Sequence, residues 1–267
     1  MAFVVFENCD LMVLEAGLGG EFDATNVCDK ALSVITPIGI DHQAFLGESI
    51  EAIAGTKIRS IQKQVLLAPQ VYDEVFTIAE EIAKEKGARL YIHNTLSQVM
   101  SELEVIAKEK SWGNYLLENA SVALQALDIM ELSYDIDDLR TLELFGRFYP
   151  WTKNIRIDVG HNPLAAKAIE KALDQKVILI YNSLDDKDYE AVLQTLKPKV
   201  KHVEILPIHS QRATTLSAIE KALEKVGISY DYYKNKIDKN EHYLVFGSFY
   251  VVEEFLNKMQ KKTHVPK

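Results

Sequence analysis

Length, composition and charge place this chain among globular proteins of two domains. Its 267 residues are 48% apolar, which is enough to build two cores of ordinary size. The net charge of −9 argues against nucleic acid or an anionic membrane surface as a general partner. No apolar run approaches the ~20 residues of a membrane span, and the two cysteines, Cys9 and Cys28, form neither a metal-binding spacing nor a disulfide framework. We therefore expect a soluble cytoplasmic protein that meets anionic ligands through small basic islands.

The first half of the chain alternates strand-like and helical patterns. The strand-like runs are 11–14, 32–35, 65–67 and 90–92, and the helical patterns are about 49–63, 70–86 and 114–130. After Gly146 the alternation restarts, with strands at 155–157, 177–180, 203–206 and 243–246 and helices near 163–173, 186–196, 214–225 and from about 249. Alternation of this kind predicts βαβ units on mostly parallel sheets. We expect two α/β domains, 1–143 and 144–267, with the boundary within 141–150.

The segment 14–26 is the most informative stretch, because it follows an apolar run with an acid, three glycines and a polar turn. The pattern predicts a short buried strand at 11–14, with Glu15 at the edge of the sheet where ligands bind in α/β proteins. Glycine lets the backbone approach a ligand closely. A glycine-rich turn alone is more often only a tight turn, so the argument depends on the whole string.

Lys57 occupies an apolar face of the predicted helix 49–63, the face that also carries Ile53, Ala54 and Ile58. One interpretation is that its stem lies along apolar surface and its ammonium reaches solvent. The other is a buried lysine with a lowered pKa, whose neutral amine can react with CO2 to form a carbamate. His42 follows the run 32–35 by a short loop, where it is either part of a hydrogen-bonded turn with Asp41 or a metal ligand.

The second domain offers an anion site at strand-to-helix turns. Asn162 is a good N-cap and Pro163 a good first helical residue, which places Asp158 and His161 beside free amide groups and the positive end of a helix dipole. Ser248 opens the last helix in the same way. Each turn has a plain interpretation as a helix cap without a ligand.

Several motifs carry a family resemblance. Residues 15–26 read E-A-G-L-G-G-E-F-D-A-T-N and resemble the E-x-G-x-G-G-x-x-D-A-T-N segment of the folylpolyglutamate synthase/dihydrofolate synthase family, the folate branch of the Mur ligase superfamily. The stretches 38–42, 46–47 and 53–57 are similar to the family's I-G-x-D-H…L-G…I-A-x-x-K region. Its G-R, D-G-A-H-N-P, D-K-D and G-S elements resemble 146–147, 158–163, 186–188 and 247–248.

The resemblance implies a fold and a set of site residues. The fold is a Mur ligase central domain, shortened at its N-terminus, and a Rossmann-like C-terminal domain that binds glutamate. The implied cofactors are ATP and Mg2+, with metal ligands from Glu15, His42 and a carbamylated Lys57. The implied nucleotide contacts are Asn119, Arg147, Asp158 and Lys57, the substrate contacts are Asp23, His161 and Ser248, and the catalytic residues are Lys57, Arg147 and His161.

Some features depart from the family pattern. No G-x-x-x-x-G-K-[ST] occurs in the sequence, and the family's phosphate-binding loop lies upstream of the acid and glycine segment, so we expect a member that lacks its N-terminal part. Val159 and Gly160 replace the usual glycine and alanine between Asp and His, and Tyr115 and Leu116 stand where His and Gln are common. Lys187 is expected in the first turn of a helix, where a plain surface charge is one interpretation.

The leading hypothesis is an ATP-dependent ligase that adds L-glutamate to dihydropteroate or tetrahydrofolate through an acyl phosphate. We expect ATP, L-glutamate and the folate substrate as partners, a monomer, and no activity from the 267-residue chain alone. A non-catalytic module of the same fold is one alternative. A peptidoglycan-type Mur ligase is another, against which the Asp-Ala-Thr-Asn string argues.

Overall fold

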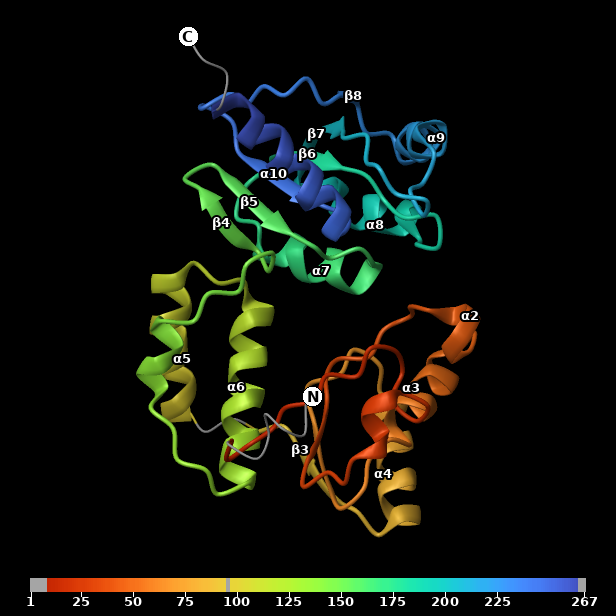
Figure 1. Cartoon of the computed structure of the whole chain (residues 1–267), viewed down its shortest axis with the longest axis vertical. Helices are drawn as coiled ribbons and strands as arrows, with labels where there is room; N and C mark the ends of the chain where they lie inside the picture. The colour runs from red at the N-terminus through yellow and green to blue at the C-terminus, as the bar shows by residue number, and fades with distance from the viewer. Residues whose placement is uncertain (1–8, 95–96, 264–267) are drawn as a thin grey trace. The chain divides into compact units, whose positions relative to one another are not determined.

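The computed structural model describes residues 9–94 and 97–263, and the chain forms two compact units (Figure 1). Of the described residues, the first unit holds 9–94 together with 125–132, and the second holds 97–124 and 133–263. Residues 97–124 therefore group with the second unit, whereas the sequence pattern predicts a boundary at 143/144. Where the domain boundary falls stays a prediction.

The first unit is built on a parallel sheet in the order β1-β2-β3. Its elements are η1 (Ala24–Val27), β1 (Ser33–Ile35), α2 (Gln43–Leu46), α3 (Ile50–Ile58), β2 (Gln64–Leu67), α4 (Glu74–Lys86) and β3 (Arg89–Ile92). Ile35, Val65 and Leu67 pack on the buried faces of α3 and α4, and this cluster is the core of the unit. The predicted parallel sheet and its three later strands are confirmed, while α3 is shorter than the predicted 49–63.

The predicted strand at 11–14 is wrong. These residues have no regular secondary structure, and the Val13 residue is 85% exposed. A strand needs a neighbour for its N–H and C=O groups, and among the described residues no strand pairs with this segment. Glu15 is consequently an exposed residue in a segment without regular secondary structure and does not stand at the end of a buried strand.

The second unit is built on a six-stranded sheet in the order β4-β5-β9-β6-β7-β8, parallel except for the β4–β5 pair. Its strands are β4 (Tyr149–Thr152), β5 (Ile155–Asp158), β6 (Val177–Tyr181), β7 (Val200–Ile205), β8 (Tyr230–Tyr232) and β9 (Tyr243–Phe246). Its helices are α5 (Ser97–Lys110), η2 (Ile136–Arg140), α7 (Pro163–Ala172), α8 (Tyr189–Leu196), η3 (Lys197–Lys199), α9 (Leu216–Val226) and α10 (Phe249–Thr263). Helix α6 (Asn114–Ile129) begins in this unit and ends in the first.

Helices cover both faces of this sheet. One core packs α7, α8 and α9 on Leu179, Val203 and Phe246, and the other packs α10 on Ile157 and Val245. Alternate residues of β9 thus enter opposite cores, as a parallel strand buried on both faces requires. The Rossmann-like architecture expected for the C-terminal half is confirmed. The short strands β4 and β8 and the helix α5 were not predicted.

No helix in the described part of the chain has the length and apolar content to cross a membrane.

Candidate functional site

Asp23 organises the glycine-rich turn of the first unit. Its Oδ2 accepts hydrogen bonds from the backbone amides of Gly17 at 2.9 Å and Leu18 at 3.0 Å. Its Oδ1 accepts from the amide of Thr25 at 2.9 Å and from the Thr25 hydroxyl at 2.8 Å. These bonds, with the Thr25 amide as the largest contribution, lower the pKa of the carboxyl to about 2. The aspartate of the Asp-Ala-Thr-Asn string therefore holds the turn in shape.

The glycine turn packs closely on helix α3. A Cβ on Gly20 would lie 2.6 Å from the carbonyl oxygen of Lys57, and Gly19 has a φ of +70°. The amide of Glu21 donates to the carbonyl of Thr56 at 3.0 Å, and its carboxylate pairs with Arg59 at 2.6 Å. The glycines are thus needed for contact between the turn and the helix that carries Lys57.

A pocket of about 290 Å³ lies beside this turn. It is lined by Leu18, Gly20, Phe22, Asp23, Ala24, Phe45, Leu46 and Thr56. Phe22 and Phe45 are 85% and 76% exposed, which is unusual for phenylalanine in the absence of a ligand or partner. The pocket therefore has mostly apolar walls beside the Asp23 carboxylate.

Lys57 is partly buried on α3, whose neighbouring residues Ile53, Ala54 and Ile58 are 0% exposed. Burial lowers the pKa of the Lys57 amine, and the negative charge of Asp41 partly opposes this shift. Partial burial on this face is compatible with both interpretations of Lys57. Carbamylation of this amine stays a prediction.

The remaining residues of the predicted metal site occupy loops. His42 has a left-handed backbone with φ 53°, and its Nε2 lies 3.9 Å from Asp41 Oδ2. Among the described residues, no group of three or more His, Cys, Asp or Glu side chains lies close enough together to hold a metal ion. A metal site made by Glu15, His42 and Lys57 therefore stays a prediction. Lys57 could contribute an oxygen ligand only if its amine were carbamylated.

The second unit has buried polar side chains at the end of β5 and in the loops that follow its parallel strands. They are Asp158, Asn182, Ser183, Lys187, Thr214 and Ser248, each at most 7% exposed. The carboxyl ends of β5, β9 and β6 are neighbours in this sheet, and α7, α8 and α10 begin beside them. Open α/β sheets bind ligands at this edge.

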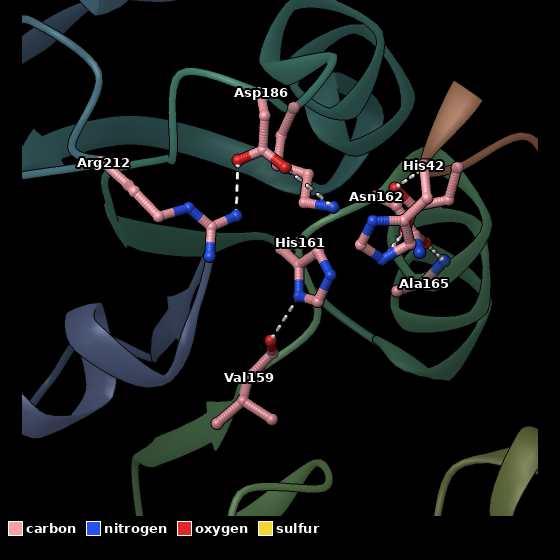
Figure 2. Close-up of polar contacts among 9 residues, drawn as sticks. His42, Val159, His161, Asn162, Ala165, Asp186 and Arg212 are labelled. Carbon is pink, nitrogen blue, oxygen red and sulfur yellow. Dashed lines mark hydrogen bonds and ion pairs between the residues drawn. The ribbon is translucent and has the colours of Figure 1, made fainter. Parts of the chain in front are cut away.

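The turn before α7 has the predicted cap. Asn162 Oδ1 accepts from the amide of Ala165 at 2.8 Å, and Pro163 is the first residue of the helix (Figure 2). His161 Nδ1 lies 3.2 Å from the carbonyl oxygen of Val159, also in Figure 2. Because a carbonyl only accepts, Nδ1 carries the proton in this contact, so in the neutral ring Nε2 carries the lone pair.

Ser248 caps α10 as predicted, with Oγ accepting from the amide of Val251 at 3.3 Å. The preceding Gly247 has a φ of +131°, and a Cβ there would lie 1.9 Å from the carbonyl oxygen of Asn182. Only glycine allows β9 to turn into α10 beside the β6 loop. A contact between Ser248 and a substrate stays a prediction.

The interpretation of Lys187 as a surface charge is wrong. Its side chain is 3% exposed and its Nζ lies 3.4 Å from Asp186 Oδ2. Asp186 also accepts a hydrogen bond from Arg212 at 2.8 Å, as Figure 2 shows. Helix α8 begins only at Tyr189 with Asp188 as its N-cap, so Lys187 precedes the helix. Sequence reasoning missed this buried cation, because an Asp-Lys-Asp string has the composition of an exposed turn.

The other predicted nucleotide contacts differ in exposure. Asn119 and Arg147 are exposed residues, whereas Asp158 is buried and accepts three hydrogen bonds from protein donors. Burial raises the pKa of the Asp158 carboxyl above its usual value, and these hydrogen bonds oppose the shift. Contacts of Asn119, Arg147 and Asp158 with a nucleotide stay predictions.

Comparison with known proteins gives a consistent relationship, although no family model matches the chain. Helicobacter pylori folylpolyglutamate synthetase, a solved structure, is 38% identical, with a TM-score of 0.70 and coverage of 97% of this chain and 68% of that one. The dihydrofolate synthase/folylpolyglutamate synthase of Escherichia coli K12 is 30% identical over 271 residues, which are 91% of this chain and 63% of that protein. A ligand-free bifunctional enzyme from Yersinia pestis is 25% identical, with a TM-score of 0.79 and coverage of 97% and 70%.

Two mostly parallel sheets, a glycine-rich turn stabilised by an aspartate and helix N-termini at a ligand edge define a protein of the Mur ligase fold. The chain belongs to the folylpolyglutamate synthase/dihydrofolate synthase family. It spans about two thirds of the length of the relatives that it matches, for example 66% of the enzyme from Buchnera aphidicola of Schizaphis graminum.

Proposed function

We propose that this chain carries two parts of an ATP-dependent ligase that joins L-glutamate to dihydropteroate or tetrahydrofolate. In this reaction the folate carboxylate attacks the γ-phosphorus of ATP and forms an acyl phosphate, with ADP as leaving group. The amine of glutamate then attacks the acyl carbon, loses a proton, and expels phosphate as the amide bond forms. Family membership is the observation that carries the proposal, together with the family's motifs at 15–26 and 158–163.

The first unit is proposed to hold the folate end and the metal. The pocket beside Asp23 has apolar walls, and the Asp23 carboxylate stabilises the glycine turn that forms one side of it. Mg2+ prefers oxygen ligands, and an unmodified lysine would repel it. A carbamate on Lys57 and the carboxylate of Glu15 would supply oxygens, with His42 as a nitrogen ligand, and the bound cation would offset phosphate charge.

The second unit is proposed to hold glutamate. His161 and Ser248 lie at the N-termini of α7 and α10, where backbone amides and helix dipoles favour a carboxylate. Lys187 adds a buried cation in the neighbouring loop after β6. Orienting the amine and excluding water would be the main contributions of these residues to rate.

A fusion protein tests the proposal. The part of the H. pylori relative that precedes its acid and glycine segment is joined to this chain from Leu14, and incorporation of labelled glutamate is measured with ATP, Mg2+ and either dihydropteroate or tetrahydrofolate. We expect incorporation that depends on ATP and on the folate. Ser248→Ala and His161→Ala in the fusion should raise the KM for glutamate more than the KM for ATP.

The parent H. pylori enzyme serves as the positive control, and circular dichroism establishes that each fusion is folded. A folded fusion that incorporates no glutamate under conditions where the parent is active would contradict the proposal and favour a non-catalytic module. Incorporation into a nucleotide-sugar peptide in place of a folate would favour a peptidoglycan-type ligase.

A further inference from the structure

Arg147 stands on a sharp bend whose two neighbouring residues are both tied to the end of strand β5. The carbonyl oxygen of Gly146 accepts from the amide of Val159 at 2.9 Å. On the other side of Arg147, the amide of Phe148 donates to Asp158 Oδ2 at 2.8 Å. The exposed guanidinium of Arg147 therefore projects from a backbone that is fixed at both ends.

Phe148 keeps this bend in an unfavourable conformation. Its φ of 47° is left-handed, which is rare for a bulky residue and persists only where the surroundings impose it. Its ring is buried, and the Arg156 guanidinium carbon lies 4.4 Å from the ring centroid. Arg156 Nη1 also donates to the Phe148 carbonyl at 3.0 Å, so ring, carbonyl and amide are all held.

Asp158 connects this bend to the turn that carries His161. Its Oδ1 accepts from the amide of Gly160 at 2.7 Å. Its Oδ2, which holds the Phe148 amide, also accepts from the hydroxyl of Tyr115 on α6 at 2.9 Å. Gly160 has no room for a side chain, because a Cβ would lie 2.7 Å from the Phe246 ring and 2.8 Å from Asp158 Oδ1. The buried Asp158 carboxylate thus accepts hydrogen bonds from helix α6, from the Arg147 bend and from the His161 turn.

We propose that Asp158 and Tyr115 form a positioning pair that holds the Arg147 bend and the His161 turn in one fixed arrangement. Asp158 acts through its neighbours, since both of its oxygens are engaged by protein donors. The Tyr115 hydroxyl completes the set of donors from α6. This role is independent of the proposed ligase activity, because it concerns only how two side chains are presented within the second unit.

The chain offers a selective test in Asp158→Asn. The asparagine oxygen can still accept from Gly160, and its NH2 group can donate to the Tyr115 hydroxyl, which also accepts. Only the Phe148 amide then loses its acceptor. In the 267-residue chain we expect amide exchange at Phe148 to become at least about tenfold faster while Gly160 keeps its protection. We also expect the Arg147 Nε–H and His161 ring signals to shift in NMR spectra, which a general loss of stability would not produce.

Tyr115→Phe and the double variant complete the design, with Tyr230→Phe, which removes a hydroxyl bound to Glu224, as a matched control. Tyr115→Phe should shift the Arg147 and His161 NMR signals, and the control should leave them unchanged. In the double variant these shift changes should be only slightly larger than in Asp158→Asn. Unchanged exchange at Phe148 in folded Asp158→Asn, or unchanged Arg147 and His161 signals, would overturn the proposal. If Asp158→Asn does not fold, Tyr115→Phe is the deciding variant. Arg147 and His161 signals in Tyr115→Phe that match those of the control would overturn the proposal.

Discussion

The pKa values of two acidic side chains, Asp23 and Glu204, shift in opposite directions because their surroundings differ. Asp23 is accessible and accepts several hydrogen bonds, so its carboxylate is the favoured form. Glu204 on β7 is partly buried, and its Oε2 has no hydrogen-bond partner among the described residues. Burial and the negative charge of Asp231 raise the pKa of Glu204. The same chemical group therefore stabilises one turn and destabilises one strand at neutral pH.

Asp23→Asn should loosen the glycine turn. In the wild type the carboxylate stabilises the turn above its ordinary pKa near 3.8, and this contribution is lost as pH falls through the folded value of about 2. The NMR shifts of the Gly17 and Leu18 amides should therefore titrate with a midpoint near pH 2 in the folded wild type. They should be constant there in the variant. Titration of both amides in Asp23→Asn would contradict the assignment.

Glu204→Gln should raise the free energy of unfolding, and more so at pH 8 than at pH 5. An acid with a raised folded pKa binds its proton more tightly in the native state than in the unfolded chain, so the protein loses stability as pH rises above the ordinary pKa through the folded pKa. Glutamine removes the charge that is poorly solvated. Urea midpoints at both pH values measure the effect, with exposed Glu253→Gln as the control. An equal change at both pH values would refute the explanation.

The Lys57 amine is either a plain ammonium that reaches solvent or a carbamate, and the two can be distinguished by experiment. If it is carbamylated, the activity of the fusion protein should rise when bicarbonate is restored after CO2 depletion. Lys57→Ala should then lower activity by about tenfold or more, as loss of a metal ligand does, and a small carboxylic acid should restore part of it. Mass spectra and 13C NMR with labelled bicarbonate should show one carbamate. A plain lysine under these conditions would end the hypothesis.

At the scale of elements, capped helix N-termini position the candidate site. Helices α3, α7, α8 and α9 each have an N-cap residue whose side-chain oxygen accepts a hydrogen bond from the amide three residues further on. These N-cap residues are Ser49, Asn162, Asp188 and Thr215. These caps fix where each loop ends and which amides remain available. Each cap therefore fixes the start of a helix and the end of the loop before it.

Asn162→Ala should destabilise the second unit by about 1 kcal/mol, because the amide of Ala165 loses its acceptor. Asn162→Ser keeps an acceptor and should recover most of this loss. Urea unfolding followed by far-ultraviolet circular dichroism measures both. Equal stability of the alanine and serine variants would show that the cap contributes nothing.

At the scale of the whole molecule, each compact unit has its own hydrophobic core. One core fills the first unit between β1–β3 and α3 with α4, and two cores sandwich the sheet of the second unit. The 267 residues contain no glycine-rich loop with a following lysine and hydroxyl to cradle the β- and γ-phosphates.

The 267-residue chain tested alone should release no phosphate from ATP above background when Mg2+, dihydropteroate and glutamate are present. It should nevertheless fold, because each unit buries its own apolar residues. Phosphate release and circular dichroism of the purified chain check both statements. A rate equal to that of the H. pylori relative would show that the phosphate loop is dispensable.

The sequence by itself determined the alternation of strands and helices, the family and the capped turn before α7. Those features depend on local periodicity and on residues whose conformation is set by their neighbours in the chain, such as Asn162 and Pro163. The tertiary structure decided what depends on distant partners. Residues 11–14 are apolar yet not a strand, because a strand needs a paired neighbour. Lys187 is charged yet buried, and its partner Asp186 is also bound by Arg212, which is 26 residues away in the sequence. Asp158 is engaged by Tyr115 and Phe148, 43 and 10 residues away, and no local pattern predicts such a contact.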